Sequence, residues 1–300
     1  MGEASIRHRG ETVKIGFVGI GTMGRPMAQR LLGAGHEVSI CSRSRNAGVE
    51  SLAEQGATIR ESPAALAVDV EMVLTALPTE ASVREVYASM SEVAHGDQLY
   101  ADHSTVSVKL NQWCAAQLAA KGASFLDAPV SGGPAGADAG TLTVMVGGDE
   151  EAFARALSVF EAFGAKIRRC GPTGSGQAIK LVNQLLVAVH TMASAEAAAM
   201  AVQLGADLST VQDVIGTSFG SSTMLLRNLP RFIGRDFTPA TPVGLIAKDL
   251  SIIHTEAMDA GVPLFLGGLA QQCFLEATAR GWNREDMSAL IKLWDRAPES

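Results

Sequence analysis

The sequence has few cysteines, no excess of basic residues and no long uninterrupted apolar run. Its four cysteines stand far apart in the 300-residue chain and form no Cys-x-x-Cys pair. This spacing argues against a disulfide framework or a metal site, and it fits a reducing cytoplasm. Asp and Glu (31) outnumber Lys and Arg (24), for a net charge of −7. Binding to nucleic acid or to a membrane surface is therefore not expected.

Secretory and membrane-spanning segments are also not expected. Residues 1–11 contain basic side chains, but no apolar segment follows them, so we predict a flexible leader rather than a signal peptide. The longest apolar run, residues 181–195, lacks Asp, Glu, Lys and Arg but holds Asn183, Gln184 and His190. It is shorter than the roughly 20 apolar residues that a membrane span needs. This run predicts a buried helix.

Short apolar runs alternate with helical stretches in the first part of the chain. The predicted strands are residues 13–19, 37–41, 71–77, 98–102, 124–130, 141–147 and 165–171. This alternation predicts an α/β domain with a doubly wound parallel sheet and helices on both faces. After the Gly- and Pro-rich residues 170–176, the sequence is almost entirely helical. We therefore predict a Rossmann-type dinucleotide-binding domain over residues 12–173 and an all-α domain over residues 174–300.

A glycine-rich loop follows the first predicted strand and opens the first helix. In this context the pattern Gly-x-Gly-x-x-Gly is typical of a dinucleotide site. Gly19 permits the tight turn, Gly21 lets the backbone approach a pyrophosphate, and Gly24 lets helix and strand pack closely. The helix N-terminus complements the phosphate charge. The predicted cofactor loop comprises Gly19, Ile20, Gly21, Thr22, Met23 and Gly24.

The end of the second predicted strand indicates which dinucleotide is preferred. An NAD site usually carries Asp or Glu here to bind the ribose 2′-OH, but this sequence has Ser42 and Arg43. A guanidinium can pair with a 2′-phosphate. The sequence therefore favours NADP(H) over NAD(H), and the alternative is a solvated charged loop.

Three further segments follow strands, at residues 76–78, 102–107 and 127–137. In a doubly wound sheet, ligands bind at the carboxyl ends of the strands. Ser131, Gly132 and Gly133 would present a hydroxyl and two accessible N–H groups, which suit a substrate carboxylate. Each segment alone is better explained as a capped turn, but together they predict a site at one edge of the sheet.

Five motifs in this order resemble the β-hydroxyacid dehydrogenase family, and the resemblance covers residues 13–295. They are GFVGIGTMGRPMA (16–28), DAPVSGG (127–133), GTLTVMVGG (140–148), GPTGSGQAIKLVNQ (171–184) and AKDL (247–250). The resemblance implies a Rossmann-type domain, a long inter-domain helix, an all-α second domain and a homodimer or homotetramer. It also implies NAD(P)-dependent interconversion of a small 3-hydroxy acid and its semialdehyde.

The resemblance also assigns individual residues. It makes Lys180 the catalytic lysine, and it places Asn183, Gln184 and the segment Ser131–Gly133 at the substrate. Many members read KLxNN where this chain reads KLVNQ, so Gln184 is a departure with a longer reach. No metal is implied. Beyond the glycine loop, Ser42 and Arg43, the implied cofactor contacts are Leu77, Pro78, Thr105 and Lys248.

Lys180 stands among apolar residues, where an unpaired ammonium is costly. It is three residues before Asn183 and four before Gln184, so the three side chains project from one helix face. We expect this polar face to line the cleft between the domains and the face with Val182, Leu185, Leu186 and Val189 to pack into the core.

A lysine beside a reacting carbonyl could stabilise the developing alkoxide and donate a proton. The alternative interpretation is a lysine that extends along a helix surface into solvent. Two other functions stay open. An imine reductase of related architecture usually replaces the lysine, and a non-catalytic dinucleotide-binding module would not need Lys180, Asn183 and Ser131 together. The sequence does not name the substrate.

Overall fold

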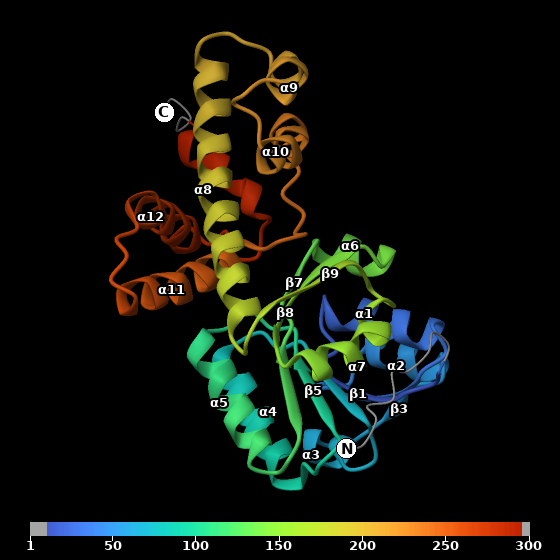
Figure 1. Ribbon diagram of the computed structural model, residues 1–300. Helices are drawn as coiled ribbons and strands as arrows, with labels where there is room; N and C mark the ends of the chain where they lie inside the picture. The colour runs from blue at the N-terminus through green and yellow to red at the C-terminus, as the bar shows by residue number, and fades with distance from the viewer. Residues whose placement is uncertain (1–10, 296–300) are drawn as a thin grey trace. The chain divides into compact units, whose positions relative to one another are not determined.

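The computed structural model describes residues 11–295, so most of the predicted leader lies outside the described residues. The chain forms two compact units, one up to Lys180 and one from Leu181 onward. The boundary falls inside the long helix α8 (Ser175–Gln203), which is labelled in Figure 1. The predicted order of a sheet domain followed by an all-helical domain is confirmed.

The first unit is built on one nine-stranded sheet with the order β3-β2-β1-β4-β5-β6-β8-β7, and β9 pairs with β8. The pairs from β3 to β6 are all parallel, whereas β6 and β7 pair with β8 in the antiparallel direction. The strands are β1 (Lys14–Val18), β2 (Glu37–Cys41), β3 (Thr58–Ile59), β4 (Met72–Thr75), β5 (Leu99–Asp102), β6 (Ser124–Asp127), β7 (Val130–Ser131), β8 (Leu142–Gly148) and β9 (Gly164–Gly171).

Two details of the sheet differ from the prediction. The single strand predicted over residues 124–130 is wrong, because Ala128 and Pro129 separate β6 from β7. Proline has no N–H to donate to a strand ladder, so it tends to interrupt one. The two-residue strand β3 was not predicted, because so short a segment leaves no period-2 pattern in the sequence.

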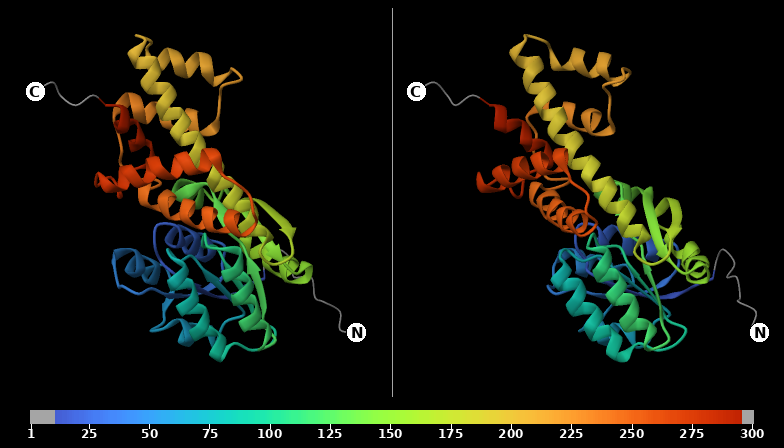
Figure 2. Two further views of the ribbon diagram at one scale, coloured as in Figure 1. Left: turned by 90° about the vertical axis from the view of Figure 1, so that its left-hand side faces the viewer. Right: turned by 60° about the vertical axis from the view of Figure 1, so that its left-hand side comes forward.

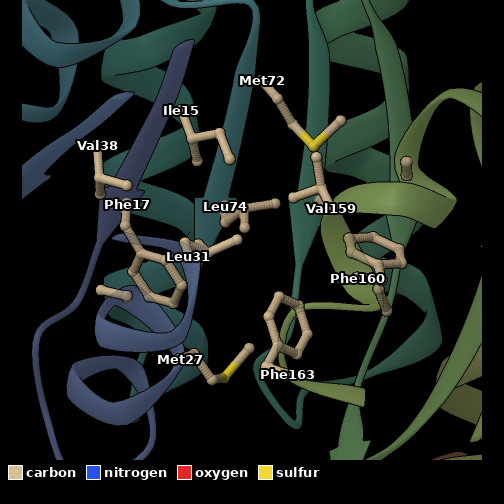
Figure 3. Packing of buried hydrophobic residues seen from close by; sticks show 14 of the residues in the cluster. Ile15, Phe17, Met27, Leu31, Val38, Met72, Leu74, Val159, Phe160 and Phe163 are labelled. Carbon is tan, nitrogen blue, oxygen red and sulfur yellow. The ribbon is translucent and has the colours of Figure 1, made fainter. Parts of the chain in front are cut away.

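Helices cover both faces of this sheet, as predicted. Alternate strand residues point to opposite faces, so Ile15 and Phe17 belong to one buried cluster and Val18 to the other. Figure 3 shows the first cluster, in which Met27 and Leu31 face Phe163 and Val159 across the sheet side chains. This face carries α1 (Gly24–Gly33), α2 (Ala47–Glu54) and α7 (Glu150–Phe160). The other carries α3 (Pro63–Ala67), α4 (Glu80–Val93) and α5 (Val108–Ala119).

The second unit is helical, and Figure 2 shows its helices gathered along α8. Helix α10 contains Pro230 in its interior. The last element of the unit, η1, is a 3₁₀ helix rather than an α-helix. The elements are α9 (Leu208–Gly216), α10 (Thr223–Gly234), α11 (Val243–Asp259), α12 (Phe265–Ala279) and η1 (Met287–Trp294).

A buried carboxylate, Asp286, ties the second unit together. Arg227 donates to both of its oxygens at 2.6 and 2.7 Å, and the backbone N–H groups of Thr241 and Ser288 donate to it as well. Burial opposes ionisation, but these hydrogen bonds outweigh it and hold the pKa of Asp286 below its usual range. The residue therefore joins α10, η1 and the segment before α11.

Helix α8 is long and apolar enough to cross a membrane. This is weak evidence for a membrane span, because core helices of soluble proteins meet the same criteria. Ala188, Thr191, Ala195 and Ala198 form a buried stripe on it at helical spacing. This stripe is typical of a helix that packs within a protein unit.

We expect His103 to make the fold sensitive to acid. Its Nδ1 donates to Ala128 O at 2.6 Å, its ring packs against Phe160 and Phe163, and burial lowers its pKa from 6.5 to about 4. Between these pH values the unfolded chain binds a proton that the native state does not. The free energy of unfolding should therefore fall with decreasing pH, by about 1.4 kcal/mol per pH unit from this residue.

The variant His103→Asn keeps a donor for Ala128 O but does not titrate. Urea unfolding at several pH values between 7 and 4 should give it a shallower loss of stability than the wild type shows. Parallel pH profiles of the two proteins would contradict the assignment.

Candidate functional site

The glycine loop has the geometry that its sequence predicts. Gly19 has a φ of +100°, and a Cβ there would lie 2.3 Å from Ala76 O. A Cβ at Gly24 would lie 1.9 Å from Gly19 O, whereas nothing lies within 4 Å of the Cβ position of Gly21. Two of the glycines are therefore required by the loop's own packing, and the third faces open space.

The open space is a pocket of about 490 Å³ between the glycine loop and the start of α2. The N-terminus of α1 has no side-chain cap and no acidic residue in its first turn, whereas Asn46 caps α2. Free N–H groups at a helix N-terminus suit a phosphate. The residues thus fit a dinucleotide. The lining residues are Ile20, Gly21, Thr22, Arg25, Asn46, Ala47, Gly48 and Ser51.

Ser42 and Arg43 follow β2 at the same edge of the sheet. Arg43 is exposed. Its neighbour Arg45 instead lies 2.5 Å from the carboxylate of Glu50 on α2. The guanidinium of Arg45 is thus engaged in an ion pair with Glu50.

The ends of β4 and β5 are joined by buried hydrogen bonds. Asp102 accepts from the hydroxyls of Thr75 and Ser104 at 2.8 and 2.6 Å, and Ser104 Oγ accepts from Leu77 N at 2.9 Å. The segments that contain Leu77, Pro78 and Thr105 are therefore fixed next to each other. Because β2, β1, β4 and β5 are neighbours in the sheet, these segments share one edge with the glycine loop.

Asp127, at the end of β6, holds the start of α8. Its carboxylate accepts from the N–H groups of Gly174 and Gln177 at 2.6 and 2.9 Å. Burial raises its pKa, and these two hydrogen bonds act in the opposite direction. The first turn of α8 is thus anchored to the same edge of the sheet.

The predicted carboxylate-binding turn follows β7. Ser131 ends the strand opposite Thr143 of β8, and its side chain is partly exposed. Gly132 and Gly133 have φ values of +133° and +65°, in the region that favours glycine. The turn leads into the short helix α6 (Gly133–Ala139).

The burial of side chains along α8 corrects one part of the prediction. Lys180 and Gln184 are only 6% and 7% exposed, whereas Val182 and Leu186 are 57% and 49% exposed. The prediction that Val182 and Leu186 pack into the core is therefore wrong. Apolar residues flank the lysine on both sides, so the sequence pattern alone did not show which side is covered.

The second unit carries the remaining predicted residues. Asn183 Nδ2 donates to Gln184 Oε1 at 3.0 Å, and Gln184 Nε2 donates to Asp249 Oδ2 at 2.5 Å. Lys248 Nζ lies 3.0 Å from Asp249 Oδ1. The amide of Gln184 thus connects Asn183 on α8 with the Lys248–Asp249 pair on α11.

In each unit, the structure brings together residues that the sequence had predicted separately. The prediction missed Asp102, Asp127 and Gln177, which connect the predicted segments. A carboxylate at the end of a buried strand was one available signal. The other was a glutamine three residues before the lysine on the same helix face.

Comparisons with known proteins agree with this geometry. Residues 14–171 match the family described as the NAD-binding domain of 6-phosphogluconate dehydrogenase. Residues 174–294 match the family described as NAD-binding of NADP-dependent 3-hydroxyisobutyrate dehydrogenase.

Full-length relatives are similar over almost the whole chain. The 2-(hydroxymethyl)glutarate dehydrogenase of Eubacterium barkeri is 36% identical over 95% of this chain and 96% of its own. The L-threonate dehydrogenase of Cupriavidus necator is 36% identical over 93% and 95%. A structure of Mycobacterium tuberculosis 3-hydroxyisobutyrate dehydrogenase with L-serine superposes with a TM-score of 0.88 at 33% identity, covering 95% of this chain and all of that one.

Substitution of Gly24 should affect folding, whereas substitution of Gly21 should affect cofactor binding. We expect Gly24→Ala to lower the free energy of unfolding by a few kcal/mol, because its Cβ would lie 1.9 Å from Gly19 O. Gly21→Ala meets no atom within 4 Å and should leave stability unchanged. Its methyl group would occupy the phosphate side of the loop, so NADPH affinity should fall by about tenfold or more.

Thermal unfolding and fluorescence titration with NADPH measure the two effects. Unchanged NADPH affinity in Gly21→Ala would contradict the assignment of the open space to the phosphates.

Proposed function

The chain belongs to the β-hydroxyacid dehydrogenases, and we propose that it interconverts a small 3-hydroxy acid and its semialdehyde with NADP(H), using Lys180 as general acid and base. Members of this family are NAD(P)-dependent oxidoreductases that act on CH–OH groups. Relatives that are hydroxy-acid dehydrogenases favour this proposal over an imine reductase or a non-catalytic module.

The observation that carries the proposal is the burial of Lys180, which is 6% exposed on a helix face that it shares with Gln177, Asn183 and Gln184. Removing an ammonium from water is costly unless it is compensated, so its position on the buried face of α8 argues for a chemical role. A bound nicotinamide would supply or accept the hydride. In the reducing direction, the lysine ammonium would stabilise the alkoxide oxygen and donate its proton there. In the reverse direction, the neutral amine would accept the hydroxyl proton.

The substrate side is proposed to lie at Asn183 and at the turn Ser131–Gly133. A hydroxyl and accessible N–H groups at this turn suit the carboxylate of a small hydroxy acid. Gln184 would act beside them. Its amide already bonds Asn183 and Asp249, so it would orient Asn183 toward the substrate oxygen.

NADP(H) is proposed as the preferred cofactor because Arg43 stands where an NAD site usually has a carboxylate. The guanidinium, with Ser42 beside it, would bind the 2′-phosphate. Leu77, Pro78, Thr105 and Lys248 are proposed as further cofactor contacts.

We also propose a cytoplasmic homodimer or homotetramer that binds neither nucleic acid nor membranes. Large apolar side chains are exposed on α8 and the later helices, among them Val182, Leu186, Met258 and Phe265. Exposed apolar side chains that gather into a patch commonly pack against another subunit. A monomeric mass in light scattering would contradict the oligomer.

Replacing Lys180 should stop the reaction without preventing cofactor binding. The variant Lys180→Met keeps most of the side-chain volume but cannot transfer a proton, so kcat should fall by about 10³-fold. NADPH oxidation followed by absorbance, with a panel of small semialdehydes, measures the effect. Fluorescence titration should show an NADPH affinity close to that of the wild type. Wild-type turnover in the variant would contradict the role of Lys180.

Replacing Arg43 should change the cofactor preference. We expect Arg43→Asp to lower kcat/KM with NADPH by about 100-fold and to improve it with NADH, because the carboxylate repels a 2′-phosphate and can bind a 2′-OH. The matched control is Arg45→Ala, since Arg45 is paired with Glu50 and should not alter the ratio of the two cofactors. An equal effect of both variants would contradict the assignment to Arg43.

A further inference from the structure

We propose that Gln177 is a positioning residue that fixes the lysine-bearing turn of α8 to the loops on the cofactor side of the sheet. The inference rests on the proposed function of Lys180, and it concerns a residue that the sequence motifs did not single out. It is argued from contacts inside the first unit alone.

Gln177 is fully buried and makes one side-chain hydrogen bond across the chain. Its Nε2 donates to the backbone carbonyl of Ser104 at 2.6 Å. Ser104 and Gln177 are separated by 73 residues, so this bond connects the loop after β5 with the first turn of α8. Lys180 follows three residues later on the same buried face.

The same serine continues the connection into the cofactor-side loops. Ser104 Oγ accepts from Leu77 N and donates to Asp102 Oδ1, and Thr105 is its neighbour in the chain. Leu77 and Thr105 are both proposed cofactor contacts. The side chain of Gln177 therefore links the lysine-bearing turn to Ser104. Ser104 precedes Thr105 in the chain and is hydrogen-bonded to Leu77.

The two polar atoms of the Gln177 amide differ in their hydrogen bonding. Its Oε1 is buried and has no hydrogen-bond partner among the described residues. An unsatisfied buried polar atom is destabilising, and an apolar side chain of similar size would not have this disadvantage. What the amide adds is the bond to Ser104, which fixes an orientation.

The start of α8 does not depend on this side chain. Asp127 accepts from the backbone N–H groups of Gly174 and Gln177, and a substitution of the Gln177 side chain leaves both donors in place. Loss of the amide should therefore leave α8 anchored but free to tilt about that anchor. A small displacement of a catalytic group can lower a rate by about 100-fold.

The test compares Gln177→Met with a matched control, Gln98→Met. Gln98 is also a buried glutamine of this unit, and its Nε2 donates to the backbone carbonyls of Ala67 and Val70 at 2.6 and 2.9 Å. It stands just before β5, whereas Ser104 stands after β5, so it lies at the opposite edge of the sheet. The Nε2 of Gln98 donates two hydrogen bonds and that of Gln177 donates one, so Gln98→Met removes more hydrogen bonds.

We expect Gln177→Met to lower kcat by about 10- to 100-fold, with NADPH affinity within threefold of the wild type. Gln98→Met should lose at least as much thermal stability and keep wild-type kcat. Wild-type kcat in Gln177→Met, or the same loss of kcat in both variants, would overturn the proposal. If Gln177→Met does not fold, Gln177→Asn replaces it, because this amide is one methylene too short to reach Ser104.

The wild-type assay separates a failure of this inference from a failure of the proposed function. If none of the semialdehydes in the panel supports NADPH oxidation by the wild type, the proposed function fails. The inference is then decided by amide hydrogen exchange of residues 103–107 and 178–183. Gln177→Met should raise exchange in both segments and Gln98→Met in neither. Unchanged exchange in Gln177→Met would overturn the inference.

Discussion

The site depends on the buried carboxylate of Asp127, which determines where α8 begins. It accepts two backbone N–H groups from the first residues of the helix, and it can do so only because the surrounding backbone comes very close. A Cβ at Gly147 would lie 2.3 Å from its Oδ1, and one at Gly176 would lie 2.4 Å from Met145 O. The position of Lys180 along the helix follows from this anchor, because an α-helix advances a fixed 1.5 Å per residue.

The buried polar groups of the first unit form a connected set rather than isolated pairs. Asp102 serves Thr75, Ser104 and Asn111, and Ser104 in turn serves Leu77 and Gln177. These bonds join residues of β4, β5, α5 and α8 that lie far apart in the sequence, so they restrict how the connecting backbone segments can be arranged. The buried polar groups therefore lie where the strand ends, the loops and the start of α8 have to be held in fixed relative positions.

The sheet and the glycine loop could be predicted from the sequence because their signals are local. Hydrophobic runs, turn residues and the Gly-x-Gly-x-x-Gly spacing each lie within a few residues. The covered side of α8 could not be predicted, since Val182 and Leu186 are as apolar as a core residue and yet exposed. The connections of Asp127 and Gln177 span 50 and 73 residues, so no local pattern contains them. Helix α10 continues through Pro230, because tertiary packing can retain a helix that propensity disfavours.

The glycine loop also has a consequence for how such an enzyme can change during evolution. In the proposed function it would present backbone N–H groups to the phosphates, and substitution of neighbouring side chains would leave these donors in place. Ser42 and Arg43 stand on a separate segment after β2. The proposed phosphate contacts and the proposed discrimination between NADP and NAD therefore lie on different parts of the chain. Under this proposal, substitutions at residues 42 and 43 would change the preferred coenzyme, and the phosphate contacts of the glycine loop would stay unchanged.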